Sequence, residues 1–239
     1  MDRVIPSVLG TDTSRFQTTV RRNRFEEDQM RVVLASVLNS DSNAVDIGAH
    51  GGSVLREIIR CAPHGRHIAY EPLPDHAKRL DGLFPRVDVR QVALSDEEGE
   101  TSFVHVRTLS PWSGLRRRPY PPTVKDEDLE EITVRVERLD RSLPQDYVPR
   151  LIKVDVEGAE EWVLRGALRI LKAHRPSVIF EHSVATCEAF GTTSSSLYQL
   201  ICEEAGLHIF DLAGDGPYSL SEFLESQRQL RWINYLAQP

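Results

Sequence analysis

The sequence predicts an α/β fold built on a doubly wound, mostly parallel sheet with an inserted β-hairpin and loop. From residue 26 onward, short apolar segments that resemble strands alternate with segments of helical periodicity. Segments such as Leu151–Val154 and 178–180 are almost wholly apolar, which is typical of parallel strands covered by helices on both faces. A glycine-rich turn at residues 48–52 directly follows the first strand, as in many ligand-binding sheets.

The elements of this sheet can be assigned in order along the chain. Residues 1–25 are polar without a clear period, so we expect an irregular N-terminal arm followed by one domain over residues 26–239. The domain is expected to contain helices near residues 26–38, 54–59, 77–83, 163–171 and 197–206, and strands near 44–47, 67–70, 87–94, 151–154, 178–180, 208–212 and 232–236.

About fifty residues separate the third and fourth of these strands, which is too long for a single crossover. Residues 101–106 and 132–139 alternate in polarity and predict a β-hairpin or two paired strands. Residues 107–131 between them are rich in proline and charge, and we expect a mobile surface loop that closes over the site.

Composition and charge exclude several classes of function. The chain has 239 residues, 40% of them hydrophobic, which suits a folded domain, and a net charge of −7 gives no general attraction to nucleic acid. The three cysteines, Cys61, Cys187 and Cys202, lack metal-binding spacing. No secretory signal or membrane-spanning run is apparent, so we expect a cytoplasmic protein without a membrane partner; an oligomer is compatible with the sequence.

The turn after the first strand carries the first candidate site residues. Asp46 is a carboxylate at the strand end, and Gly48 allows a tight turn whose N–H groups approach a ligand closely. An acid there would repel a pyrophosphate and attract an ammonium or sulfonium group. A purely structural strand-to-helix turn is the alternative interpretation.

The next two strand ends suit the remainder of a nucleoside ligand. Glu71, 25 positions after Asp46, is placed to accept from both hydroxyls of a ribose. After the third strand, an adenine would stack on Leu94 and hydrogen-bond to the backbone or to Ser95. Glu71 does not distinguish between nucleoside cofactors, and a simple acidic turn would also explain residues 95–99.

The fourth strand end is the most specific motif. Asp155 and Glu157 emerge together at the carboxyl edge after a buried strand, where two acids can hold an amine, bind a cation or take a proton. After the fifth strand, His182 is a candidate general base, and a structural histidine is the alternative. We therefore take Asp155, Glu157 and His182 as the candidate catalytic residues and name no metal ligand.

Together these motifs resemble the FkbM family of methyltransferases over residues 44 to 239. The shared segments are V-D-I-G-A from Val45, E-P at Glu71, A-L-S-D from Ala93, S-G-L at 113–115, L-D at 139–140, K-V-D-V-E-G-A-E from Lys153 and N-Y-L-A from Asn234. The resemblance implies a Rossmann-like sheet of seven strands and S-adenosylmethionine as cofactor. It also implies methylation of a hydroxyl, less often an amine, on a sugar-containing or polyhydroxylated small molecule.

The resemblance also indicates which residues would bind the cofactor. They are Asp46, Gly48, His50, Glu71, Ala93, Leu94, Ser95 and Asp155. His50 stands where the family usually carries asparagine, so an imidazole would replace an amide near the methionine end of the cofactor.

Other functions and partners remain open from the sequence. An NAD(P)-dependent oxidoreductase would use the same fold, but the turn lacks the G-x-G-x-x-G spacing. A non-catalytic cofactor-binding module is a third possibility. The Arg116–Arg118 run would suit a phosphorylated or sulfated acceptor or nucleic acid, or else form a solvated loop tip.

Overall fold

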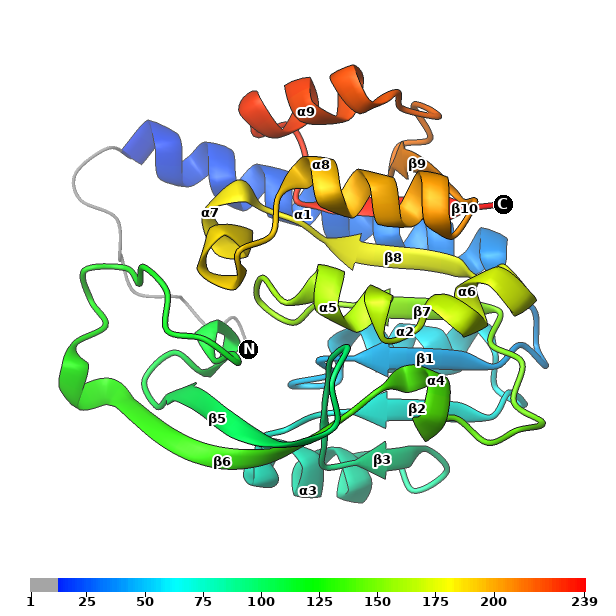
Figure 1. The fold of residues 1–239 in the computed structure, drawn as a ribbon, viewed down its shortest axis with the longest axis horizontal. Helices are drawn as coiled ribbons and strands as arrows, with labels where there is room; N and C mark the ends of the chain where they lie inside the picture. The colour runs from blue at the N-terminus through cyan, green and yellow to red at the C-terminus, as the bar shows by residue number, and fades with distance from the viewer. Residues whose placement is uncertain (1–12) are drawn as a thin grey trace.

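The computed structural model describes residues 13–239 and contains a seven-stranded sheet between two layers of helices (Figure 1). The strand order is β3-β2-β1-β7-β8-β10-β9, with only β10 antiparallel to its neighbours within this sheet. The strands are β1 (Ala44–Ile47), β2 (His67–Tyr70), β3 (Asp88–Arg90), β7 (Leu151–Val154), β8 (Ser177–Glu181), β9 (His208–Asp211) and β10 (Asn234–Gln238). The predicted seven-stranded Rossmann-like sheet is confirmed.

The parallel strands end at one level. Ile47 of β1 pairs in register with Tyr70 of β2 and with Val154 of β7, which pairs in turn with Phe180 of β8. The residues that follow these four strands therefore emerge at the same edge of the sheet. In Figure 1 all four arrowheads point to the left, the side on which the inserted ribbon of β5 (Gly99–Val106) and β6 (Leu129–Glu137) extends.

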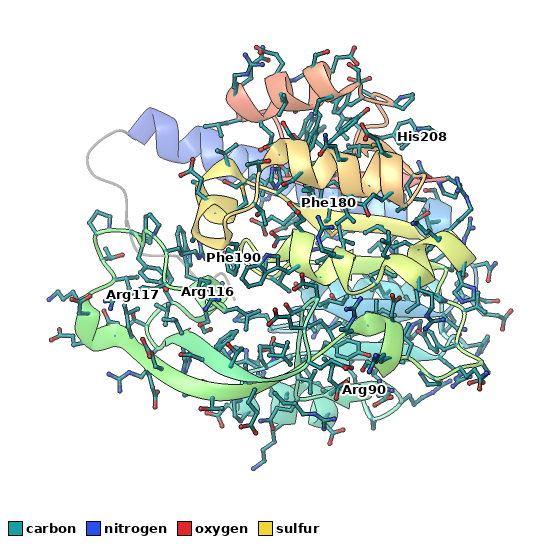
Figure 2. All side chains as sticks on the ribbon, viewed as in Figure 1. Arg90, Arg116, Arg117, Phe180, Phe190 and His208 are labelled. Carbon is teal, nitrogen blue, oxygen red and sulfur yellow. The ribbon has the colours of Figure 1, made fainter. Side chains whose placement is uncertain are left out.

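Helices cover both faces of the sheet because the central strands are apolar on both sides. The helices are α1 (Thr13–Val37), α2 (Ser53–Cys61), α3 (Pro74–Leu83), α4 (Leu139–Ser142), α5 (Glu160–Arg165), α6 (Leu168–His174), α7 (Val184–Cys187), α8 (Ser194–Tyr198), which a π-helical turn (Gln199–Glu204) continues, and α9 (Leu220–Arg228). One core packs α1 and α2 on Leu151 and Ile179; the opposite core packs α5, α6 and α8 on Ile152 and Phe180. Figure 2 shows Phe180 beneath α8.

The expected third strand, residues 87–94, is wrong as a single element. β3 (Asp88–Arg90) stays at the edge of the large sheet, whereas β4 (Ala93–Leu94) joins a second sheet in the order β4-β6-β5. Val92 turns into the core between them, and Ala93 then pairs with Val136 of β6. An alternating apolar pattern cannot show that its two halves belong to different sheets.

The expected hairpin is present and longer than predicted. β5 (Gly99–Val106) and β6 (Leu129–Glu137) are antiparallel over their whole length, from Gly99 opposite Val136 to Val106 opposite Leu129. Two short 3-10 helices, η1 (Ser110–Trp112) and η2 (Asp126–Asp128), lie in the connection between them.

Two further boundaries differ from expectation. α1 already begins at Thr13, so residues 13–25 are helical and not irregular; the rest of the expected arm, residues 1–12, lies outside the described residues. The last strand covers residues 234–238 in place of 232–236. Its pairing with β8 and β9 sets these limits, which sequence alternation fixes only to within a few residues.

Candidate active site

The carboxyl edge of the sheet holds a cavity of about 200 Å³. Its floor is formed by residues that follow β1, β2 and β7, and its roof by the inserted segment between β5 and β6. The lining residues are Asp46, Ile47, Gly48, Ala49, His50, Ser53, Val54, Tyr70, Glu71, Pro72, Leu73, Val92, Ala93, Leu94, Phe103, Ser110, Pro111, Ser113, Leu115, Lys153, Asp155, Val156 and Glu157. Seven of the eight predicted cofactor-binding residues are therefore brought together, the exception being Ser95.

Asp46 is almost fully buried, yet one carboxylate oxygen lacks a partner. It is 2% exposed, and its buried Oδ2 makes no hydrogen bond to any residue that the structure describes. Burial raises the pKa of Asp46 to about 7, because removing a carboxylate from water favours its neutral form. An unpaired buried oxygen is costly unless a ligand satisfies it, so Asp46 stays a candidate ligand-binding group.

Gly48 brings the first turn unusually close to the neighbouring strand end. Its φ is +78°, and a Cβ at this position would lie 1.8 Å from the carbonyl oxygen of Asp155. Its N–H donates to the carbonyl of Tyr70 at 3.0 Å. Only glycine fits this conformation and this approach, so the turn after β1 is held tightly against the ends of β2 and β7.

Glu71 is fixed by the backbone of two neighbouring turns. Its Oε2 accepts from the N–H of His50 at 2.8 Å and its Oε1 from that of Leu73 at 2.9 Å. Each oxygen retains a second lone pair, so the carboxylate can still accept from ligand hydroxyls at the cavity wall. Burial raises the pKa of Glu71.

His50 connects the floor of the cavity to its roof. Its backbone is left-handed, with φ of 43°, and its Nε2 lies 2.9 Å from the Oγ of Ser110 in η1. The ring also lies against His76, with 4.4 Å between centroids. Burial lowers the pKa of His50, so the imidazole is neutral and can serve as a hydrogen-bonding wall group.

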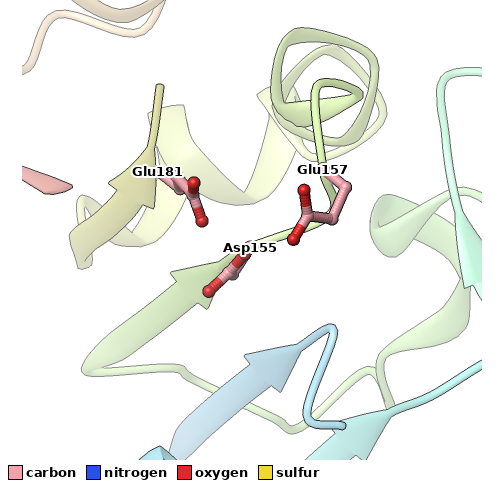
Figure 3. Close-up of side chains that lie close together, drawn as sticks. All are labelled: Asp155, Glu157 and Glu181. Carbon is pink, nitrogen blue, oxygen red and sulfur yellow. The ribbon is translucent and has the colours of Figure 1, made fainter. Parts of the chain in front are cut away.

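Three carboxylates gather where β7 and β8 end (Figure 3). Oxygens of Asp155, Glu157 and Glu181 lie within 4.8 Å of one another. Such spacing suits a cation, and two buried side-chain cations already pair with its members: Lys153 Nζ lies 3.1 Å from Asp155, and Arg118 pairs with Glu157. We therefore assign the cluster to these two cations and name no metal ligand.

The proton distribution in this cluster follows from burial and charge. Burial opposes ionisation of Asp155, but the Lys153 ammonium and a hydrogen bond from Glu181 hold its pKa below the ordinary value. Burial raises the pKa of Glu181 well above normal, and the adjacent charge of Asp155 adds to the effect. Burial would lower the pKa of Lys153, yet the surrounding carboxylates raise it. Burial and the neighbouring charges therefore favour the ionised forms of Asp155 and Lys153 and the protonated form of Glu181.

Glu157 lies on the cavity wall, and burial has a larger effect on its pKa than the neighbouring cation has. Burial raises its pKa to about 8, despite the opposing influence of the Arg118 guanidinium. A carboxyl with such a pKa exchanges its proton near neutral pH, which is what a general base or acid requires. Of the three predicted catalytic residues, Asp155 and Glu157 therefore stand together at the cavity.

His182, the third predicted catalytic residue, is not at the cavity. It is 2% exposed, its Nε2 lies 2.8 Å from the Oγ of Ser194, and its ring stacks on Phe223 at 5.7 Å. Burial lowers its pKa to about 4. The structure thus favours the structural alternative over the expected role as base, because the helices that pack over β8 and β10 enclose this strand end.

Ser95 is likewise directed elsewhere. Its N–H donates to Glu137 and its hydroxyl to Asp96, and it lines a separate acidic hollow beside Arg116 and Trp162. The chain turns toward β6 after Leu94, which carries Ser95 away from the cavity that Ala93 and Leu94 line.

Several residues that line the cavity or contact its acidic residues were not predicted as site residues. Lys153 and Glu181 carried a usable signal, since both belong to motifs at strand ends. Phe103 and Ser110 carried none, because only the folding of the insertion brings them to this edge. Arg118 belongs to the basic run noted in the sequence, but no sequence pattern pairs it with Glu157.

Comparison with known proteins places these features in context. The methyltransferase FkbM domain matches residues 46–208. The solved structure of methyltransferase FkbM from Methylobacillus flagellatus KT superposes with a TM-score of 0.51 at 18% identity, covering 84% of this chain and 44% of that one. The structure of the plantazolicin methyltransferase BpumL in complex with SAH covers 95% of this chain and 90% of its own, with a TM-score of 0.46 and 11% identity.

Among curated proteins, the AMB antimetabolite synthetase AmbE of Pseudomonas aeruginosa is 29% identical over 165 residues, or 54% of this chain. The match spans only 8% of that synthetase and less than half of the solved FkbM structure. Within residues 13–239, every helix is too short or too polar to span a membrane.

Proposed function

The chain belongs to the FkbM methyltransferase family and is an S-adenosylmethionine-dependent methyltransferase, and on this premise we propose that it methylates a hydroxyl group of a small, sugar-containing or polyhydroxylated acceptor. Family membership accounts for the enzyme class and the cofactor. The acceptor, the methylated atom and the roles of individual residues are our proposal.

The cavity residues fit the cofactor. The unpaired oxygen of Asp46 and the ionised Asp155 suit the positive charge of its methionine end, and the close approach made by Gly48 leaves backbone rather than side chain at that wall. Glu71 retains lone pairs for the ribose hydroxyls. Ala93, Leu94 and His50 complete the set of residues that would hold the cofactor. When bound, S-adenosylmethionine supplies a methyl group made electrophilic by its sulfonium.

The cavity is small for a site that must hold both a cofactor and an acceptor. About 200 Å³ is below the roughly 300–1,000 Å³ of typical small-molecule sites. Ser110, Ser113 and Leu115 of the insertion form the roof. We expect the insertion to move outward to admit ligands, so the predicted lid at residues 107–131 is retained as part of the proposal.

Glu157 is the proposed proton acceptor. A hydroxyl must lose its proton as its oxygen is methylated, and this proton would pass from the acceptor oxygen to a carboxylate oxygen of Glu157. The observation that carries this proposal is a carboxylate at the cavity wall with a pKa raised to about 8 by burial. Asp155, held ionised by Lys153, would remain an anion that orients the reacting groups.

The acceptor is proposed to be a metabolite rather than nucleic acid. The net charge is −7, and the three arginines of the basic run are engaged: Arg116 lies over Trp162, Arg117 pairs with Asp126, and Arg118 pairs with Glu157. These contacts weaken the case for a phosphorylated or sulfated acceptor at that run. The similarity to a segment of an antimetabolite synthetase supports a small-molecule context.

Two linked measurements test the proposal. Mass spectrometry of the purified protein should detect co-purified S-adenosylmethionine or its demethylated product. Incubation with isotopically labelled S-adenosylmethionine and matched panels of polyhydroxylated and amino-bearing acceptors should then place the label on oxygen. Labelling confined to nitrogen would overturn the hydroxyl assignment, and bound NAD would contradict the cofactor.

A further inference from the structure

Arg118 differs from its two neighbours in the basic run. Arg116 and Arg117 are exposed on the insertion (Figure 2), whereas Arg118 is only 7% exposed. All three belong to the connection between β5 and β6, far in sequence from the motifs at the strand ends. A buried arginine in an otherwise exposed, charged segment requires a specific partner.

The partner is Glu157, and two aromatic rings enclose the pair. The Arg118 guanidinium lies 4.8 Å from the ring centroid of Trp112 and 5.9 Å from that of Tyr120. Its Nη2 donates to the carbonyl of Trp112 at 3.3 Å and to the Glu157 carboxylate. Removing either partner from such a buried pair leaves an uncompensated charge, whereas removing both is far better tolerated.

Glu157 has an unusual backbone conformation in the turn that faces the insertion. Its backbone is left-handed, with φ of 62°, which is unusual for a residue with a side chain, and Gly158 follows with φ of 109°. Glu160 accepts from the N–H groups of Val156 and Gly158 and so holds the turn from the protein side.

From the insertion side, Gly114 packs directly against Glu157. A Cβ on Gly114 would lie 3.7 Å from the Cβ of Glu157, and Gly114 is itself bonded to Val104 of β5 in both directions. The backbone of Glu157 is thus held by its own turn and covered by the insertion, and its carboxylate is held by Arg118.

We propose that Arg118 is a positioning residue: by pairing with Glu157 it orients this carboxylate at the cavity wall and makes the orientation depend on the insertion being folded down. The significance for catalysis rests on the proposed function, in which Glu157 takes the acceptor proton. The structural coupling between Arg118, Glu157 and the insertion stands independently of the acceptor. An open insertion would leave Glu157 without its counter-charge, so the base would be assembled only when the site is closed.

The test compares Arg118→Met and Arg118→Lys with the matched control Arg117→Met, whose arginine is exposed and pairs only with Asp126 among the described residues. The first readout is chymotrypsin cleavage after Trp112, which is followed by Ser113; this measurement needs no acceptor. We expect Arg118→Met to speed cleavage about tenfold or more and Arg118→Lys to speed it less, because it keeps the charge. Arg117→Met should leave the rate unchanged.

The second readout separates positioning from a merely structural role. Carbon-13 NMR of the glutamate carboxyls, with the Glu157 signal assigned by its loss in Glu157→Gln, reports its titration midpoint. Arg118→Met should raise this midpoint by roughly 1–3 pH units, and Arg118→Lys should restore most of it. The double variant Arg118→Met/Glu157→Gln should recover much of the protease protection, because it leaves no unpaired charge. Such recovery would show that faster cleavage of the single variant reflects the lost pair and not general unfolding.

Unchanged cleavage and an unchanged Glu157 midpoint in Arg118→Met would overturn the positioning role, whatever the acceptor proves to be. If Arg118→Met speeds cleavage and raises the Glu157 midpoint as expected, but the methyl group is transferred to nitrogen, only the proposed function is overturned.

Discussion

β7 and β8 lie side by side in the sheet, and acidic residues follow or end both strands, but their ends differ in accessibility. After β7, Asp155 and Glu157 face the cavity, with 37% and 22% of their side chains accessible. After β8, His182 is enclosed, and its N–H donates to the carbonyl of Ile233 next to β10. A position at the carboxyl edge of a parallel sheet is therefore insufficient for a site, because the neighbouring strand and the helices above decide whether that edge is open.

The largest effect is expected from a substitution at Asp155, at the accessible end of β7. Asp155→Asn removes the anion that pairs with Lys153 and should lower the rate of methyl transfer by roughly 10²–10⁴-fold, the range associated with loss of a group that acts on the reacting atoms. Single-turnover assays with the identified acceptor would measure it. Full activity in Asp155→Asn would contradict the assignment, and activity lost to a chelator and restored by magnesium would transfer the role to a bound cation.

A second prediction extends the comparison along the same edge to β2. Glu71→Ala removes the proposed ribose acceptor, so cofactor affinity should fall by roughly 30- to 150-fold, equivalent to about 2–3 kcal/mol for hydrogen bonds to a charged group. Calorimetric titration with S-adenosylhomocysteine measures this, with Asp75→Ala on the exposed start of α3 as the matched control. Equal losses of affinity in Glu71→Ala and Asp75→Ala would contradict a specific role of Glu71 in binding the cofactor.

A third prediction tests the closed end. His182→Ala should leave methyl transfer within about threefold of wild type but lower the free energy of unfolding by about 1–3 kcal/mol, because Ser194 loses its buried hydrogen-bond partner. Thermal or urea unfolding would measure the loss. A large fall in turnover with intact stability would restore His182 as a candidate base.

The pH dependence of unfolding provides an internal check on His182. Its pKa is about 4 in the folded protein and 6.5 when unfolded, so the folded state favours the neutral ring. The corresponding stability is complete above pH 6.5 and is lost as the pH falls from 6.5 toward 4. This part of the acid destabilisation should be absent in His182→Ala.

The smallest predicted effect concerns Asp46 on β1. Because its pKa is raised to about 7, it is mostly protonated at pH 6 and mostly ionised at pH 8. A cationic ligand favours the ionised form, so cofactor affinity should rise by up to about tenfold over this interval, with proton release on binding. Calorimetry in buffers of different ionisation enthalpy would detect the release, and Asp46→Asn should abolish the pH dependence.

Local sequence patterns were enough to predict the sheet and several of the residues that line the cavity at its edge. Short buried strands alternate with helices, and parallel strands in register place Asp46, Glu71 and Asp155 at one level regardless of their separation in the chain. The tight turn at Gly48 was also predicted from the sequence, and its geometry excludes residues with a side chain. These features depend on local pattern and on the geometry common to parallel sheets.

The segments that pack over this edge of the sheet could be identified only from the tertiary structure. Ser95 lies away from the cavity because the chain changes sheets at β4. His182 lies away from it because β10 and the C-terminal helices cover the end of β8. Arg118 lies beside the cavity because the insertion folds back onto Glu157. Each outcome depends on contacts between segments distant in sequence. Periodicity and spacing record which residues lie on one face of an element, but not which other element will pack against that face.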